Sequence, residues 1–140
     1  MIIDNKHDVI ETFHASPVLF DSFLRNDDGI HFGPLESCLK AVAYKEPKEA
    51  YLYHVIIHSG RLIGECKDSG KVWYNLKQKF NTGVNVFRYI NKYEIADDFS
   101  YVIINPQIVD IIAISPIDSN ILSRYTTHLL NNDSKKGEAI

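Results

Sequence analysis

Cysteine, net charge and long apolar runs are all scarce in this chain, and each scarcity excludes a class of protein. Two cysteines, Cys38 and Cys66, are too few for a disulfide scaffold and suit a reduced compartment such as the cytoplasm. A formal net charge of −3 gives no basic field for a phosphate backbone, so nucleic acid is not expected as a partner. No apolar run reaches membrane-spanning length, and the charged residues within the first ten positions are unlike a signal peptide. We therefore expect a cytoplasmic protein without membrane contact.

The size and apolar content of the chain predict one globular domain. The chain has 140 residues, of which 45% are hydrophobic and 24% are charged, and both values are ordinary for globular proteins. This length suffices for a sizeable core within a single domain, 1–140. The residues from about 131 onward are polar, and we expect this tail to be frayed.

Apolar patterning along the chain predicts an α+β fold. Short alternating stretches predict strands at 11–15, 50–57, 61–65, 84–93, 99–104 and 108–114. Helical spacing predicts helices from Pro34 to about Tyr44, over 72–80, and beyond Pro116 through Leu129. The buried face of the first helix is expected to comprise Leu35, Leu39, Val42 and Ala43. Asn26-Asp27-Asp28-Gly29 predicts a turn, because Asn and Asp bond their own backbone and Gly permits a positive φ.

Two short segments in the first third of the chain place a histidine among small residues beside an apolar stretch. They are Thr12-Phe13-His14-Ala15-Ser16 and Gly29-Ile30-His31-Phe32-Gly33. Small residues let a ligand approach the backbone closely, and histidine offers both a hydrogen-bonding edge and a flat ring. These segments are therefore candidates for a ligand-binding site.

Other site chemistries have weaker support in the sequence. His54 and His58 have the spacing of helical metal ligands, but on the predicted strand they would lie roughly 13 Å apart. No metal site is therefore expected there. Neither cysteine lies in a nucleophile signature, and the glycines lack the lysine that a phosphate-binding loop needs. His14, His31 and an acidic cluster of Glu94, Asp97 and Asp98 remain as candidates.

The order of several motifs resembles the ADP-ribosyltransferases, and most closely their small bacterial and phage branch with a histidine in the first strand. The first part of the resemblance comprises Thr12–Ser16, the Phe-x-x-Phe segment Phe20–Phe23, and Gly29–Gly33, which opens a helix. The second part comprises Tyr89–Glu94, with an aromatic residue, an asparagine and a glutamate, and Ser100–Val109, which resembles the closing strand pair. The resemblance implies two facing antiparallel sheets around an NAD cleft, with flanking helices.

The resemblance also implies a co-substrate and a binding site. The co-substrate would be NAD, and its site would comprise His14, Ala15, Ser16, His31 and Phe32. The His14 side chain would bond the adenosine ribose, the backbone of Ala15 would hold the nicotinamide amide, and His31 would stack on the nicotinamide. Phe32 would form a wall of the pocket. Catalysis would depend on His31 and Glu94, with Asp97 and Asp98 as alternative acids.

The expected reaction is mono-ADP-ribosylation of a macromolecule, most simply a host protein, by a phage or bacterial effector that acts as a toxin or an inhibitor of host defence. Cleavage of the bond between ribose and nicotinamide builds positive charge on the sugar, which a nearby carboxylate stabilises. Target specificity would come from loops such as 45–49 and 59–70.

Two departures from the family pattern support an alternative: Ala15 replaces the usual glycine, and Ser100 stands where poly(ADP-ribose)-type enzymes place a glutamate. The alternative is an inactive protein of the same fold that blocks a partner by contact. A third hypothesis is a metal-dependent hydrolase that uses His14, His31 and His54.

Overall fold

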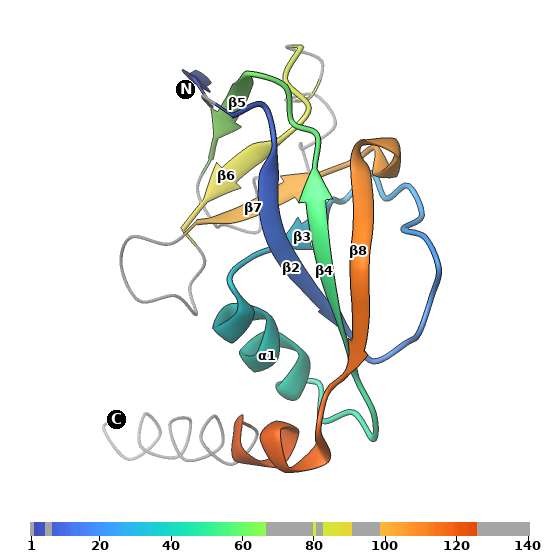
Figure 1. Cartoon of the computed structure of the whole chain (residues 1–140). Coiled ribbons are helices and arrows are strands. Elements are labelled where there is room, and N and C mark those ends of the chain that lie inside the picture. The colour runs from blue at the N-terminus through green and yellow to red at the C-terminus, as the bar shows by residue number, and fades with distance from the viewer. Residues whose placement is uncertain (1, 5–6, 67–79, 81–82, 91–98, 126–140) are drawn as a thin grey trace, which may run out of the picture.

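The computed structural model describes residues 2–4, 7–66, 80, 83–90 and 99–125, and these form a small α+β fold (Figure 1). Its strands are β1 (Ile2–Asp4), β2 (Ile10–Ser16), β3 (Ile30–Phe32), β4 (Tyr51–Ile57), β5 (Leu62–Glu65), β6 (Phe87–Tyr89), β7 (Ser100–Ile103) and β8 (Val109–Pro116). The helices are α1 (Leu35–Ala43), a short 3₁₀ helix (Pro106–Ile108) and the helical residues 119–125. None of the described helices is long and apolar enough to cross a membrane.

Most of the predicted elements are confirmed, with shifts at their ends. The predicted strands at 11–15, 50–57, 61–65, 99–104 and 108–114 correspond to β2, β4, β5, β7 and β8. The strand predicted over 84–93 is wrong in its first part, because only Phe87–Tyr89 join a sheet. Val84 and Val86 precede this strand as buried core residues without strand structure, so their apolar character reflects burial alone. Residues 91–93, the helix predicted at 72–80 except residue 80, and the tail lie outside the described residues.

The first helix begins one residue later than Pro34. Pro34 is its N-cap, with a ψ of 154° that is extended rather than helical. Its predicted buried face is only half correct: Val42 and Ala43 are buried, but Leu35 is 43% exposed and the small side chains of Ser37 and Cys38 are buried instead. Small side chains let α1 lie close to β2, and the Cys38 thiol donates to the Phe13 carbonyl at 3.2 Å. The face of α1 that packs on the core therefore carries small side chains at Ser37 and Cys38 rather than Leu35.

The strands form two sheets that share a core. One sheet has the order β2-β4-β8 and is antiparallel, with seven residue pairs between β2 and β4. The other has the order β1-β5-β6-β7-β3. Strands of the first sheet cross β6 and β7 at a steep angle in Figure 1. One core cluster takes side chains from both sheets, so the sheets face each other: Ile10, Tyr53, Val55 and Ile57 on one side, and Ile30, Phe32, Ile63 and Ile103 on the other.

The expectation that both sheets are antiparallel is wrong for one pair of strands. β5 and β6 are parallel, with Gly64 opposite Phe87 and Glu65 opposite Arg88. The connection between β5 and β6 spans residues 66–86, which is long enough for the crossover that parallel strands require. A Cβ atom on Gly64 would overlap the Phe87 ring, so any larger residue there would require this ring to move.

A backbone bridge joins the two sheets where the histidine-bearing strands meet. The Phe13 amide donates to the Gly33 carbonyl at 3.1 Å, and the Gly33 amide donates to the Phe13 carbonyl at 2.9 Å. The buried Thr12 hydroxyl also donates to the Gly33 carbonyl, at 3.0 Å. Because His14 follows Phe13 directly and His31 precedes Gly33 by two residues, this bridge fixes the separation of the two histidines.

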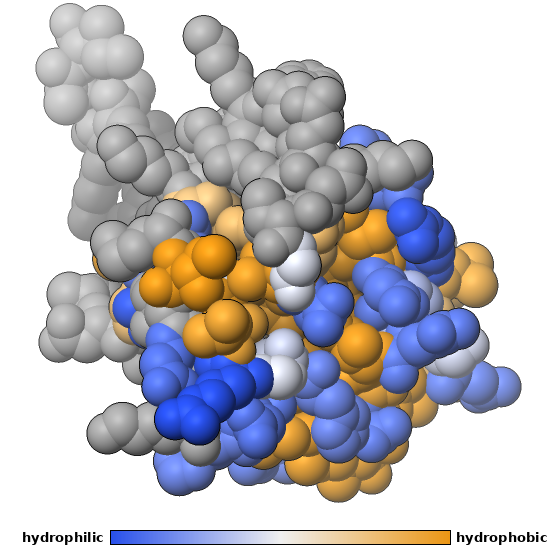
Figure 2. Space-filling model, turned by 90° about the horizontal axis from the view of Figure 1, so that it is seen from above, coloured by the Kyte–Doolittle hydropathy of each residue, from blue (hydrophilic) through white to orange (hydrophobic). Residues whose placement is uncertain are grey.

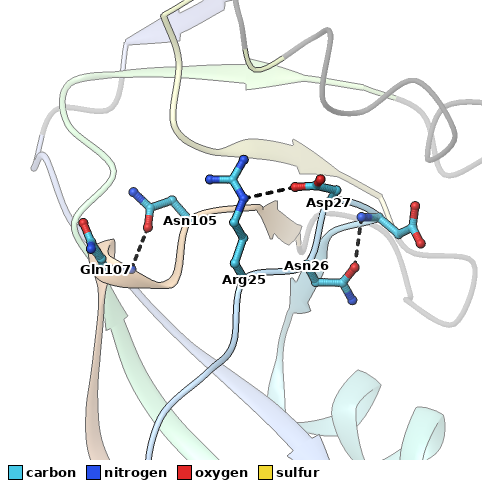
Figure 3. A network of polar contacts seen from close by, with 6 residues as sticks. Arg25, Asn26, Asp27, Asn105 and Gln107 are labelled. Atoms are coloured by element: carbon cyan, nitrogen blue, oxygen red, sulfur yellow. Dashed lines mark hydrogen bonds and ion pairs between the residues drawn. The ribbon is translucent and has the colours of Figure 1, made fainter.

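The connection from β2 to β3, loop 17–29, is ordered by local hydrogen bonds. The predicted turn at its end is confirmed: Gly29 has a φ of 102°, and the Asn26 carboxamide oxygen accepts from the Asp28 amide at 3.0 Å. Figure 3 shows this bond beside the ion pair between Arg25 and Asp27. On the face drawn in Figure 2, hydrophobic residues reach the surface among polar ones. In loop 17–29 the exposed hydrophobic residues are Val18, Leu19 and Leu24.

Candidate functional site

A cavity of about 560 Å³ lies between the end of β2, strand β3, helix α1 and loop 17–29. Its wall includes four of the predicted cofactor-binding residues, His14, Ala15, His31 and Phe32. The prediction that the two histidines line one cavity is confirmed, although they belong to different sheets. Ser16 does not line this cavity, because its hydroxyl turns toward loop 17–29 and accepts a hydrogen bond from the Val18 amide at 3.1 Å.

The imidazole of His14 has a fixed tautomer. Its Nδ1 lies 2.7 Å from the carbonyl oxygen of His31, and since a carbonyl can only accept, Nδ1 carries the proton and donates. The neutral ring then presents Nε2 as an acceptor. Burial lowers the pKa of His14 below its ordinary value of 6.5; the bond to the His31 carbonyl opposes this shift, and the positive charge of Lys45 adds to it. His14 is therefore neutral near pH 7 and can accept a hydrogen bond from a hydroxyl group.

Aromatic rings surround the His14 imidazole. The Phe23 ring lies edge-on to it, with centroids 5.1 Å apart, and the Phe32 ring lies 5.5 Å away. The Phe20 ring stacks on the buried Tyr53 ring with a 4.2 Å separation and an 8° interplanar angle. The Tyr53 hydroxyl also accepts from the Phe20 amide at 2.7 Å. These contacts anchor loop 17–29 against β4, so the loop forms a fixed aromatic wall of the cavity.

His31 has a different partner. Its Nδ1 lies 2.7 Å from the Tyr89 hydroxyl, and the two rings meet edge-to-face with centroids 5.7 Å apart. Tyr89 lies on β6 and pairs with Ser100 on β7, and both of these residues line the cavity. Ser100 is 1% exposed. Three neighbouring strands, β6, β7 and β3, therefore contribute one polar side chain each to the same wall.

The predicted acids cannot be placed in this cavity. Glu94, Asp97 and Asp98 all lie outside the described residues. Among the described residues of the wall, Lys45 alone carries a formal charge. The described part of the cavity is thus mainly apolar and aromatic, with histidine, tyrosine and serine side chains and the cation of Lys45. Such a wall suits a ligand with flat rings, hydroxyl groups and negative charge.

The remaining candidates for metal chemistry are separated from the cavity. His54 stacks on Phe13, and its Nε2 pairs with Glu11 at 2.6 Å. His58 pairs with Asp110, also at 2.6 Å. Within the ranges that the structure describes, no three His, Cys, Asp or Glu side chains are grouped so that they could hold a metal ion. The structure does not bring His54 to His14 and His31, as the metal-dependent hydrolase would require.

Several wall residues were not assigned to the site by their sequence pattern. Tyr89 and Ser100 lie in matched motifs, but no sequence feature pairs Tyr89 with His31, 58 residues earlier. Cys38 lies within the predicted first helix, outside any nucleophile signature, and it lines the cavity. Lys45 belongs to a loop that was proposed for target recognition. Tyr89 ends β6 and pairs with Ser100 at the start of β7, whereas Cys38 lies within α1 and Lys45 follows its C-terminal end.

No protein-family model, curated protein or solved structure matches this chain. The fold and the site therefore define the protein only at a coarse level. It is an α+β protein with two packed sheets and a cavity lined by aromatic residues and two histidines.

Proposed function

We propose that this protein is an NAD-dependent mono-ADP-ribosyltransferase of the cytoplasm that modifies a host protein, as a phage or bacterial effector. One observation carries the proposal. His14 and His31 come from two separate motifs and two separate sheets, yet both line one aromatic cavity, and the family resemblance assigns both of them to an NAD site. The cavity volume of about 560 Å³ lies in the range of small-molecule pockets.

The described residues suit the binding part of this reaction. The neutral His14 ring can accept a hydrogen bond from a ribose hydroxyl through Nε2, because Nδ1 already donates to a carbonyl. The His31 ring, held by the Tyr89 hydroxyl, can stack on the nicotinamide. The apolar walls exclude water from the reacting sugar, and this strengthens any electrostatic stabilisation there.

In the proposed reaction the bond between the ribose C1′ and the nicotinamide nitrogen breaks. The electron pair leaves with nicotinamide, which departs as a neutral molecule, and positive charge develops on the sugar. A nucleophile of the acceptor protein then bonds to C1′ and loses its proton to a carboxylate or to solvent. Glu94 is the proposed carboxylate, on the strength of the family resemblance.

The direct test measures nicotinamide release from NAD by the purified protein, together with the intact mass of candidate host proteins. We expect released nicotinamide and a mass increment of one ADP-ribose on the target. His58→Ala is a suitable control variant, because His58 is paired with Asp110 away from the cavity. No NAD binding by calorimetry would contradict the proposal.

A second candidate is a binding protein without turnover, and two residues of the cavity wall favour it. Ser100, in the position of the family glutamate, and Ala15, in the position of the family glycine, both line the cavity. A serine hydroxyl cannot stabilise a developing positive charge as a carboxylate does. Binding of NAD or a host protein with no nicotinamide release would support this candidate over the enzyme.

A further inference from the structure

Lys45 differs from the other residues of the cavity wall because it brings a charge to the opening. It follows the C-terminal end of α1, where its amide donates to the Val42 carbonyl at 3.1 Å. The next residue, Glu46, has a φ of 49°, and its amide donates to the Ala43 carbonyl at 2.9 Å. Two hydrogen bonds thus fix the turn that carries Lys45, and its exposed side chain extends to the wall that contains His14.

Most other basic side chains in the described part of the chain are neutralised by a carboxylate. The pairs are Arg25–Asp27, Lys40–Glu36, Arg61–Asp4 and Arg88–Glu65. Lys45 has no such ion pair among the described residues, and no other described wall residue carries a formal charge. Lys45 lines the same cavity as His14, and its charge adds to the lowering of the His14 pKa, which burial mainly causes. Lys45 therefore brings one positive charge to the described wall of the cavity, beside aromatic side chains.

We propose that Lys45 forms an anion subsite at the cavity opening and that this subsite binds the diphosphate of the dinucleotide. The inference rests on the proposed function for the identity of the dinucleotide. The two phosphates are the only negative groups of NAD, so a single lysine at the opening selects for them. Lysine binds phosphate as a compact charge with three rotatable donors, and this tolerates the varied geometry of a flexible diphosphate.

The arrangement explains how one cavity can receive both ends of such a ligand. Flat and hydroxylated groups contact the neutral wall around His14 and His31, where a charge would lose its hydration. The charged middle of the ligand remains at the half-open rim beside Lys45, where water still solvates it. Neutral nucleosides would lack this second contact.

The test compares ADP with adenosine, which differ only in the diphosphate, by calorimetry on the full chain. For Lys45→Gln we expect the Kd of ADP and of NAD to rise about tenfold, which corresponds to the loss of one exposed charge-assisted contact. The Kd of adenosine should not change. Lys45→Arg should restore most of the ADP affinity. The ADP affinity should also fall at high salt, and this salt dependence should be smaller in Lys45→Gln.

Lys48→Gln is the matched control, because it removes the same charge from an exposed lysine three residues further along that does not line the cavity. Equal ADP affinity in wild type and Lys45→Gln, or an equal loss in Lys48→Gln, would overturn the subsite. NAD binding that is insensitive to Lys45→Gln would overturn the subsite and leave the proposed function intact. ADP binding that depends on Lys45, in a protein that does not bind NAD, would support the subsite and contradict the proposed function.

Discussion

Histidines occupy two contrasting environments in this protein. His14 and His31 line the cavity, and their Nδ1 atoms contact a backbone carbonyl and a tyrosine hydroxyl, each at 2.7 Å. His54 and His58, on and beside β4, instead pair with carboxylates of neighbouring strands, each at 2.6 Å. The side-chain type is the same, but the partners are neutral in one region and acidic in the other.

This contrast shows that the partner, more than the histidine itself, distinguishes a candidate site from a surface contact. A carboxylate partner occupies a ring nitrogen of His54 and of His58 in a contact at the surface, and exposed pairs of this kind contribute about 0.2–1 kcal/mol at most. A carbonyl or hydroxyl partner orients the ring, which can then stack on a ligand or hydrogen-bond to it. The four predictions below test this distinction, from the largest expected effect to the smallest.

Removal of the His31 ring should have the largest effect. His31→Ala deletes the flat surface proposed to position the nicotinamide, and we expect nicotinamide release to fall about 100-fold, or roughly 2.7 kcal/mol in barrier. The measurement is the rate of nicotinamide release at saturating NAD. His58→Ala serves as the surface counterpart and should retain the wild-type rate. Similar rates in both variants would remove the distinction between the two regions.

Removal of the His14 ring should weaken ligand binding more modestly. His14→Ala deletes one neutral acceptor of a ribose hydroxyl, which contributes about 1 kcal/mol, so the Kd of NAD should rise about fivefold. Calorimetry measures this change, and thermal denaturation with and without NAD gives an independent estimate. An unchanged Kd would place the ribose elsewhere in the cavity.

Loss of the Tyr89 hydroxyl should affect the turnover number more than the KM. Tyr89→Phe keeps the buried ring but releases the Nδ1 contact that orients His31, so we expect the kcat to fall about threefold with little change in the KM for NAD. Tyr51→Phe is the matched control, because its hydroxyl contacts the exposed Glu49 outside the cavity. A fall in protein stability without a change in kcat would make Tyr89 a structural residue only.

The pH dependence of folding should show the smallest effect. Because the pKa of His14 is lowered in the folded protein, His14 binds a proton at a higher pH in the unfolded chain, near 6.5, than in the folded one. The free energy of unfolding should therefore decrease below pH 6.5, and this decrease should level off below the folded-state pKa. His14→Gln should lack this component in urea titrations across that range. Lys45→Gln should reduce it, because the lysine charge contributes to the shift. An increase in stability toward acid pH in the wild type relative to His14→Gln would contradict the assigned sign.

Local sequence signals were sufficient for β2, β4 and the turn at Asn26–Gly29, because alternation and turn chemistry act over a few residues. They failed where packing decides the outcome. Val84 and Val86 were predicted as strand residues, but they are buried in the core before β6 begins, although the Val86 carbonyl accepts from the Gly64 amide of β5 at 2.8 Å. Leu35 looked like a core residue, but close packing of α1 on β2 favoured Ser37 and Cys38.

The candidate site also combines residues that local sequence motifs predict with residues that only the fold brings together. The two histidine motifs contain seven of the 19 residues that line the cavity, because each motif is contiguous in the chain. The contact between His31 and Tyr89 spans 58 residues and depends on the order of β6, β7 and β3, which no local pattern encodes. Lys45 likewise reaches the cavity because of where α1 ends. The sequence alone therefore could not distinguish Lys45 from exposed neighbours such as Lys48.

The bridge between Phe13 and Gly33 has a consequence for how this protein could be altered, by selection or by design. Both of its hydrogen bonds join main-chain atoms, so neither depends on which side chain is present at positions 14 or 31. The bridge therefore holds the backbone near positions 14 and 31 together, whichever side chains these positions carry. Replacing His31 would change the chemistry offered to a ligand and leave both bridge bonds in place, whereas replacing His14 would also remove its bond to the His31 carbonyl.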